Sequence, residues 1–421
     1  MPVSAGMTDG PSVWIAAPGW MREFPRSQGV HERGQIMDRS VEPAHGSGED
    51  RGERSCATAA LSKAGVSIWL DDLSRDALVS GELRDLIAKY DVVGVTTNPT
   101  IFSSAVNGTD AYDAQLGLLA RKGVSVPDAV EALVTADIIA TAKLLYPVFQ
   151  RTGGLDGRVS VEVEPAIAFQ AKETFERASH LWKSIDRPNL MVKIPATAEG
   201  IDAIAEATAA GVSVNVTLLF NINVYRLVIR AYLSGLERAL LAGRNISTIF
   251  SVASFFVSRV DAEVDARLGD SDTPDALELR GAVGIANARL AYRVFQEEFS
   301  RGRAQRLLAR GANIQRLLWA STGVKDPEFA DTYYVNELIA PDTVITMPQA
   351  TLLAFADHGR LSSDTVTDRF ADAVDTFERL RAVGISYEKV TDKLLVDGLD
   401  KFESSWRKLN HTVEESLKKS L

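Results

Sequence analysis

Short apolar runs alternate with longer amphipathic stretches from about residue 66 to the end of the chain. Apolar runs of about four to eight residues predict buried strands, and apolar residues recurring every three or four positions predict helices. The pattern predicts eight strands, which are Val66–Leu70, Val92–Thr96, Val159–Val163, Leu190–Ile194, Val212–Leu218, Ser247–Val252, Leu317–Ala320 and Thr343–Thr346.

Helical patterns separate these runs and continue to the C-terminus. The predicted helices are Ala77–Lys89, Asp128–Phe149, Ile167–Ser184, Gly200–Ala210, Val224–Leu241, Asn287–Phe299 and Tyr387–Leu417. Alternating strands and helices indicate βαβ units and a parallel sheet. Eight such units favour an α/β fold closed into a (β/α)8 TIM barrel, with extra helices and a long C-terminal helix. An open doubly wound sheet predicts a glycine-rich turn after the first strand, whereas this chain has DDLSRD there.

The first 60 residues differ from the rest of the chain. They are rich in Gly, Ser, Pro, Arg and Glu, as in HGSGEDRGERS, and they have no sustained helical or strand period. Such a segment buries too little apolar surface to fold by itself. We therefore predict a disordered extension over residues 1–60 and a barrel domain over residues 61–421.

Composition limits the cellular compartment and the partners that we expect for this protein. The single cysteine, Cys56, excludes an internal disulfide framework and a multi-cysteine metal site, which favours a reducing, cytoplasmic compartment. We expect no signal peptide and no membrane-spanning segment, because no apolar run approaches the roughly 18 residues needed. The formal net charge of −10 argues against binding to nucleic acid or membrane surfaces. An anionic substrate would need a local basic cluster. A monomer and a homodimer both remain open.

Polar residues end most of the predicted strands. The active sites of such barrels lie at the C-terminal ends of the strands, whereas the barrel interior is filled mostly by branched apolar side chains. A single polar residue at a strand end is ordinary, but a convergent set would be costly to bury without a purpose. The set comprises Asp71, Asp72, Thr96, Thr97, Asn98, Glu162, Glu164, Lys193, Asn215, Thr217, Ser251, Ser254 and Ser321.

Lys193 is the most informative of these residues, because it lies in the apolar segment LMVKIPAT. An interior ion pair with a carboxylate is one interpretation. The other is catalytic, since removal from water disfavours an ammonium group and a neutral amine attacks carbonyls to form a Schiff base. No histidine or cysteine cluster and no cofactor motif is evident, so we expect neither a metal nor a cofactor. Asp71 and Glu162 are the candidates for proton transfer.

Seven segments, in this order, resemble the transaldolase family, and most closely its longer bacterial and plant-like members. They are SIWLDDLSR, GVTTNPTIF, VSVEVEP, NLMVKIPAT, GVSVNVTLLF, SVASFFVSRVD and LLWASTGVK. The resemblance extends from about residue 64 to the C-terminus. It implies a class I barrel enzyme that acts through a lysine Schiff base.

The resemblance also implies a role for each matched position. Lys193 corresponds to the Schiff-base lysine, and Asp71 to the aspartate that takes and returns the hydroxyl proton. Glu162 and Thr217 correspond to the pair that positions a catalytic water. The residues implied to bind substrate are Asn98, Asn215, Ser254, Phe256, Arg259, Ser321 and Lys325.

Two of these positions concern the substrate phosphate. Arg259 corresponds to a phosphate-binding arginine, although an ion pair with Asp261 or Glu263 on the same helix is an alternative. Shorter members of the family have a second arginine after the serine of the seventh strand. This chain has Ser321 followed by TGVK, so Lys325 is the nearest basic substitute.

The implied reaction moves a dihydroxyacetone unit from sedoheptulose 7-phosphate to glyceraldehyde 3-phosphate. Its products are erythrose 4-phosphate and fructose 6-phosphate, in the non-oxidative pentose phosphate pathway. One alternative is a class I aldolase that releases free dihydroxyacetone from fructose 6-phosphate. A tyrosine proton donor would suit that aldolase, but no tyrosine ends a predicted strand. A non-catalytic barrel is the other alternative, and the presence of Lys193 and Asp71 argues against it.

Overall fold

The computed structural model describes residues 56–420 except for 270–272 and 362. The predicted extension over residues 1–60 therefore lies largely outside the described residues. Its last residues are already part of helix α1, Cys56–Lys63.

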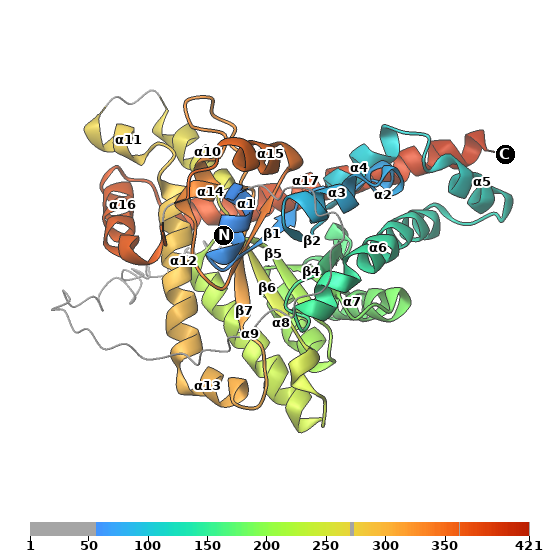
Figure 1. The fold of residues 1–421 in the computed structure, drawn as a ribbon, viewed down its shortest axis with the longest axis horizontal. Helices are drawn as coiled ribbons and strands as arrows, with labels where there is room; N and C mark the ends of the chain where they lie inside the picture. Colours follow the sequence, from blue (N-terminus) through green and yellow to red (C-terminus); the bar gives the residue numbers. More distant parts are fainter. Residues whose placement is uncertain (1–55, 270–272, 362, 421) are drawn as a thin grey trace, which may run out of the picture. The chain divides into compact units, whose positions relative to one another are not determined.

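Eight parallel strands close into a barrel in sequence order, with β8 paired to β1 (Figure 1). This confirms the predicted (β/α)8 architecture. The strands are β1 (Val66–Leu70), β2 (Val92–Val95), β3 (Arg158–Glu162), β4 (Leu190–Pro195), β5 (Val214–Leu219), β6 (Ser251–Phe256), β7 (Gln315–Ala320) and β8 (Thr343–Met347).

Helices follow the strands around the barrel, and several more than the basic eight are present in the described part of the chain. The α-helices after α1 are α2 (Arg75–Ser80), α3 (Glu82–Lys89), α4 (Pro99–Asn107), α5 (Asp113–Arg121), α6 (Val126–Arg151), α7 (Ala171–Ile185), α8 (Ala198–Ala209), α9 (Ile222–Leu241), α10 (Ser258–Leu268), α11 (Pro274–Leu279), α12 (Val283–Ser300), α13 (Gly302–Leu308), α14 (Tyr333–Glu337), α15 (Gln349–His358), α16 (Phe370–Ala382) and α17 (Tyr387–Lys419). The described residues also form three short 3₁₀ turns, which are η2 (Pro165–Ile167), η3 (Ile246–Thr248) and η4 (Thr367–Arg369).

Several predicted elements are wrong in detail, and two of them are instructive. The predicted helix Ala77–Lys89 is two helices, because Gly81 adopts φ 87° and ends α2 with a left-handed residue. The sixth strand begins at Ser251 rather than Ser247, and η3 occupies residues 246–248. Apolar periodicity does not distinguish the start of a buried strand from a preceding apolar turn.

Helix α6 has the composition of a core helix. By length and composition it is the one helix in the described ranges that could cross a membrane, and its most apolar stretch is 44% buried. A single helix of this kind is weak evidence for a span, because core helices meet the same criteria. Its buried residues include Leu133, Ile138 and Leu145, and it packs against β2, β3 and α17.

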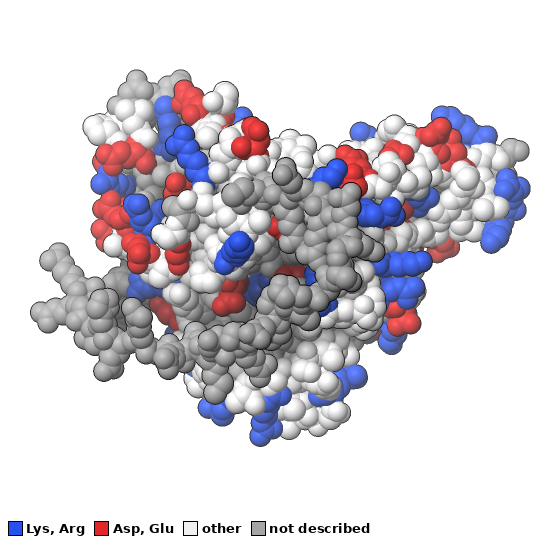
Figure 2. Space-filling view, in the orientation of Figure 1, with Lys and Arg blue, Asp and Glu red and all other residues white. Residues whose placement is uncertain are grey.

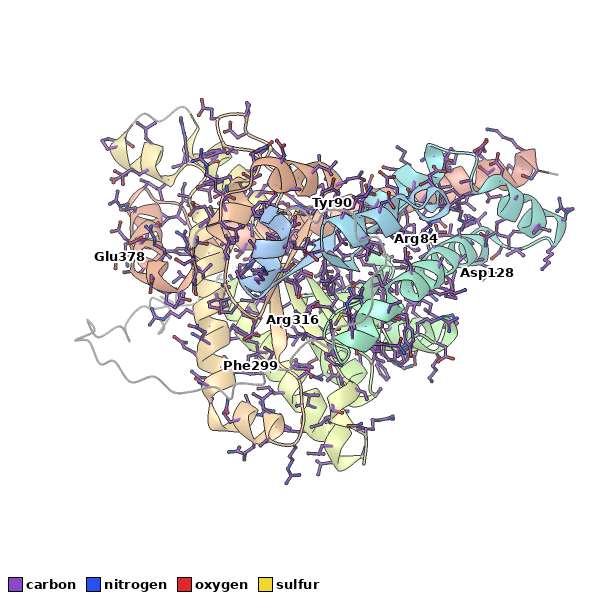
Figure 3. The ribbon with its side chains drawn as sticks, in the orientation of Figure 1. Arg84, Tyr90, Asp128, Phe299, Arg316 and Glu378 are labelled. Atoms are coloured by element: carbon purple, nitrogen blue, oxygen red, sulfur yellow. The ribbon has the colours of Figure 1, made fainter. Side chains whose placement is uncertain are left out.

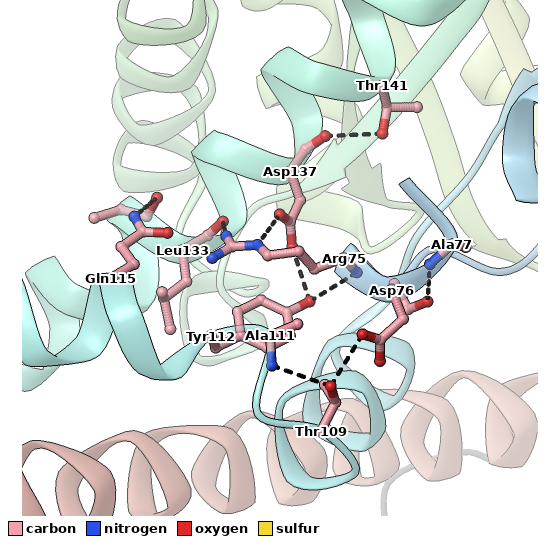
Figure 4. Close-up of polar contacts among 12 residues, drawn as sticks. Arg75, Asp76, Ala77, Thr109, Ala111, Tyr112, Gln115, Leu133, Asp137 and Thr141 are labelled. Carbon is pink, nitrogen blue, oxygen red and sulfur yellow. Dashed lines mark hydrogen bonds and ion pairs between the residues drawn. The ribbon is translucent and has the colours of Figure 1, made fainter. Parts of the chain in front are cut away.

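An ion pair fixes α6 to the start of α2 (Figure 4). Arg75 Nε donates to Asp137 Oδ1 at 2.7 Å, and the Tyr112 hydroxyl donates to Asp137 Oδ2 at 2.9 Å. The Arg75 guanidinium also lies over the Tyr112 ring, 4.2 Å from its centroid. Since Arg75 follows Asp71 by four positions, this cluster anchors the segment that leads away from the end of β1.

We expect Asp137→Ala to lower the free energy of unfolding by about 3 kcal/mol, because it leaves the Arg75 charge half-buried without its partner. Urea unfolding followed by circular dichroism measures this loss. Lys143→Ala, an exposed position on the same helix, is the matched control and should change stability by less than about 0.5 kcal/mol. A loss below about 1 kcal/mol for Asp137→Ala would show that the ion pair contributes little.

A second buried ion pair lies at the opposite end of the barrel from the C-terminal strand ends. Arg316, which Figure 3 labels, pairs with Asp156 at 2.9 Å and donates to Ser67 Oγ at 2.7 Å. Ser67 in turn donates to Asp156 Oδ2 at 2.9 Å. These contacts join β1 and β7 to the chain segment before β3. They satisfy the polar groups that would otherwise be buried without partners.

Charges on the outer helices are mixed in sign. Basic and acidic side chains lie side by side on α16 (Figure 2), where Arg379 pairs with Asp375 of the same helix and with Glu278 of α11. Exposed pairs of this type contribute little to stability.

Candidate active site

Three polar side chains lie at one level inside the barrel on neighbouring strands. The register pairs Glu162 of β3 with Lys193 of β4, and Lys193 with Asn215 of β5. Residues paired in this way place their side chains on the same face of a sheet. Lys193 is 4% exposed, and the surrounding strands shield it from bulk water.

The Lys193 amine has two polar neighbours. Its Nζ donates to the Thr97 carbonyl oxygen at 2.6 Å and lies 2.9 Å from Glu162 Oε1. Burial raises the pKa of Glu162, and the opposing charge of Lys193 offsets part of this effect. The interior ion pair that the sequence left open is therefore present. It also places a comparatively basic carboxylate within proton-transfer distance of the amine.

Two buried oxygens near this pair are unpartnered. Neither Glu162 Oε2 nor Thr217 Oγ1 has a hydrogen-bond partner within the described ranges of the protein. Buried polar atoms usually have partners, so atoms without them are candidates for binding a small molecule. Thr217 lines the cavity described below, which makes its hydroxyl accessible to such a molecule.

The backbone is distorted beside two residues of the site. Leu218, directly after Thr217, has φ 53°, and the β5–β6 register shifts between Val216 and Leu219. Ser321, directly after β7, has φ 57°. Left-handed conformations are unfavourable for residues other than glycine, and bulges change the direction of nearby side chains. Both distortions occur where strands end at the cavity.

A cavity opens above Lys193 at the C-terminal ends of the strands. Its empty volume, including its open mouth, is ≈ 420 Å³. It brings together seven predicted site residues besides Lys193. These are Asp71, Asn98, Thr217, Ser254, Phe256, Arg259 and Ser321.

Asp71 lies on the cavity wall after β1. Burial raises its pKa above the ordinary aspartate value, and the negative charge of Asp72 adds to the effect. The positive charges of Lys193 and Arg259 act in the opposite direction. Asp72 itself is exposed and does not line the cavity. The geometry therefore favours Asp71 over its neighbour as the proton-transfer group.

Asn215 differs from the other predicted binding residues. Its amide donates to Ser160 Oγ at 3.0 Å and accepts from Ser254 Oγ at 2.7 Å. It is fully buried beside Lys193 and is not part of the cavity lining. Asn98 does line the cavity, while its Oδ1 caps α4 by accepting from the Ile101 amide at 3.0 Å.

Arg259 is the second residue of α10 and faces the cavity. Its guanidinium carbon lies 5.0 Å from the centre of the Phe256 ring and 6.0 Å from that of Phe402. Burial lowers its pKa, while the charges of Asp71 and Glu162 oppose the shift. Arg259 forms no ion pair within the part of the chain that the structure describes.

The carboxylates that competed for Arg259 in the sequence have other partners. Asp261 accepts from the Gly284 amide at 2.6 Å and from the Tyr334 hydroxyl at 2.9 Å. Glu263 pairs with Arg267 and Lys393, each at 2.8 Å. The guanidinium of Arg259 is therefore available to an anion in the cavity.

Two further predicted residues lie near Arg259. The Ser321 hydroxyl is 2.8 Å from that of Ser258, the first residue of α10. Lys325 is exposed and does not line the cavity, but it shares an adjoining groove with Arg259. Within the described ranges, no three His, Cys, Asp or Glu side chains gather as a metal site would require.

Sequence reasoning named Thr96 only as a strand-end residue with no role, and it missed three other lining residues: Ala320, Thr346 and Phe402. Ala320 and Thr346 lie at the ends of strands, so their position alone was a signal. Phe402 belongs to α17 and lies far along the chain from every strand. Its place in an amphipathic helix gave no indication that it faces the site.

Comparison with known proteins shows the family to which the chain belongs. Residues 68–413 match the model of the family described as transaldolase/fructose-6-phosphate aldolase. The chain belongs to this family.

Curated relatives named transaldolase support the assignment to the transaldolase/fructose-6-phosphate aldolase family. The protein of Thermobifida fusca (strain YX) is 54% identical over 357 residues, which cover 85% of this chain and 97% of the relative. That of Mycolicibacterium smegmatis is 52% identical, with 85% of this chain and 97% of the relative covered. That of Frankia alni is 51% identical, with 86% and 97% covered. The family resemblance found in the sequence is confirmed.

Proposed function

We propose that this protein is a transaldolase that transfers a dihydroxyacetone unit from sedoheptulose 7-phosphate to glyceraldehyde 3-phosphate. The products are erythrose 4-phosphate and fructose 6-phosphate, and the reaction belongs to the non-oxidative pentose phosphate pathway. The observation that carries the proposal is the buried Lys193–Glu162 pair at 2.9 Å, with Asp71 and Arg259 on the walls of the adjoining cavity.

The first step is formation of the imine. Glu162 takes a proton from the Lys193 ammonium, and the neutral amine attacks the C2 carbonyl of the ketose. The carbinolamine hydroxyl then receives a proton and leaves as water, which gives a protonated imine. The raised pKa of Glu162 suits it to accept and return a proton. Thr217 Oγ1, which has no partner in the described part of the protein, binds the water involved.

The second step breaks the C3–C4 bond. Asp71 takes the proton of the C4 hydroxyl, erythrose 4-phosphate leaves as the aldehyde, and the bonding electrons move into the imine to give an enamine. The enamine then attacks the aldehyde carbon of glyceraldehyde 3-phosphate, and Asp71 returns the proton to the new hydroxyl. Hydrolysis of the resulting imine releases fructose 6-phosphate and regenerates Lys193.

The remaining residues hold the substrates. Asn98 and Ser254 bind the hydroxyls of the three-carbon unit, Asn215 acts on it through the Ser254 hydroxyl that donates to it, and Phe256 packs beside it. Arg259 binds the phosphate with its planar fork, together with Ser321 and Lys325. The enzyme needs no cofactor and no metal. It acts in the cytoplasm as a monomer or homodimer on sugar phosphates, and it binds neither nucleic acid nor membranes.

An assay with and without acceptor separates the transferase from an aldolase. With fructose 6-phosphate as donor, we expect rapid formation of sedoheptulose 7-phosphate when erythrose 4-phosphate is present and negligible free dihydroxyacetone when it is absent. None of the cavity-lining residues that the structure describes is a tyrosine, the proton donor that would suit the aldolase. Release of dihydroxyacetone at a comparable rate without acceptor would favour the aldolase instead.

A further inference from the structure

We propose that Lys401, on helix α17, is a further phosphate-binding side chain that completes a three-cation subsite with Arg259 and Lys325. The inference rests on the proposed function, because it names residues that bind the phosphate group of the sugar substrates. Lys401 follows the last strand of the barrel by more than 50 positions and is not part of any motif in the sequence.

The three cations share one groove that adjoins the Lys193 cavity. Arg259, Lys325 and Lys401 line this groove, and Arg259 also lines the cavity. A ketose whose carbonyl lies at Lys193 would therefore extend toward the groove through Arg259. The end of the substrate that carries the phosphate would meet all three positive charges.

Helix α17 passes close to Leu218 and Arg259 at Gly398. A Cβ atom at Gly398 would lie 3.4 Å from Arg259 Nη1 and 2.8 Å from a methyl carbon of Leu218. Residues three positions apart on a helix are neighbours on its surface, so Lys401 lies one turn from this contact. Phe402, the next residue, has its ring 6.0 Å from the Arg259 guanidinium.

The carboxylates that line the groove pair with Lys393 and not with Arg259, Lys325 or Lys401. These carboxylates are Glu263 and Asp397, and Lys393 pairs with both, at 2.8 Å and 2.6 Å. Arg259, Lys325 and Lys401 form no ion pair within the ranges that the structure describes.

The two other cations act electrostatically on Lys401. Burial lowers its pKa, and the positive charges of Arg259 and Lys325 lower it further. Three cations that repel one another and form no ion pair among the described residues are a suitable site for a phosphate dianion. Arginine would provide a bidentate contact, whereas each lysine would act as a flexible point charge.

The test compares acceptors with and without phosphate. With fructose 6-phosphate as donor, kcat/KM is measured for erythrose 4-phosphate and for D-erythrose. In a ping-pong reaction, this quantity for the acceptor does not depend on the donor concentration. We expect Lys401→Gln to lower kcat/KM for erythrose 4-phosphate about fivefold and to leave that for D-erythrose unchanged.

Three variants calibrate the result. Lys401→Arg keeps the charge and should stay within about twofold of the wild type. Lys408→Gln makes the same charge change at an exposed position on α17, about 10 Å further along the helix, and should have no effect. Arg259→Gln should lower the phosphate preference more than Lys401→Gln does. An equal loss for both acceptors in Lys401→Gln, or no loss, overturns the inference.

A binding measurement separates failure of this inference from failure of the proposed function. Inorganic phosphate is titrated into the wild type and Lys401→Gln in a calorimeter, and we expect about fivefold weaker binding to the variant. If the wild type transfers no dihydroxyacetone, the proposed function fails, while the phosphate titration still decides the role of Lys401. Equal phosphate affinity of the two proteins would remove Lys401 from the subsite.

Discussion

Lys193→Met should abolish the covalent intermediate and lower turnover by at least about 10³-fold, because the variant lacks the only amine placed beside Glu162 in the described cavity. Borohydride reduction with fructose 6-phosphate should trap an adduct on Lys193 of the wild type. Mass spectrometry of a proteolytic digest measures the adduct and identifies the modified residue.

The matched control for this experiment is Lys172→Met, on the exposed face of α7. It should form the adduct and turn over as the wild type does. Thermal unfolding of Lys193→Met must also be recorded, because the change leaves Glu162 buried without its cation. Glu162 can respond by remaining protonated, in line with the upward direction of its pKa. An adduct on another lysine, or undiminished turnover, would refute the imine mechanism.

Asp71→Asn should still form the imine but should cleave the donor about 10²- to 10⁴-fold more slowly, because the amide takes no proton from the C4 hydroxyl. Borohydride trapping measures the imine, and rapid-quench analysis of erythrose 4-phosphate release measures cleavage. Asp72→Asn is the matched control, since Asp72 is the exposed neighbour and lies outside the cavity lining. Cleavage by Asp71→Asn at the wild-type rate would remove Asp71 from the proton transfer.

The pH dependence of donor cleavage is a second measurement on Asp71. Cleavage needs the ionised carboxylate, so the rate should fall as the pH falls through the pKa of Asp71. Burial raises this pKa above the ordinary value of an aspartate. The acid limb of the wild-type profile should therefore lie at a higher pH than an exposed aspartate would give. An acid limb at the pH of an exposed aspartate would show that the carboxylate titrates as though it were exposed to solvent.

Much of the barrel could be predicted because its signals are local. The run VSIWL predicts β1 at the residues where it occurs, and the segment LMVKIP predicts β4. The errors arose where two local structures suit the same residues. The apolar stretch around Ile249 fits both a turn and a strand, so β6 was placed four residues too early.

The candidate site was predictable in part for the same reason. A barrel places its strand ends at one face, so Asp71, Lys193 and Thr217 could be assigned to a common site before any distance was known. The order of the seven segments then indicated the family to which the chain belongs. The state of each group was not predictable, because burial and neighbouring charges set the pKa directions of Asp71 and Glu162.

The sequence by itself therefore determined the number and order of the strands, the family and the central lysine. Only the tertiary structure decided that Lys193 pairs with Glu162, that Asn215 is occupied by Ser160 and Ser254, and that α17 brings Phe402 and Lys401 to Arg259. The physical reason is that these contacts join residues that are far apart in the sequence. Strand patterns record each residue's own burial, whereas a contact between α10 and α17 depends on how the whole chain closes around the barrel.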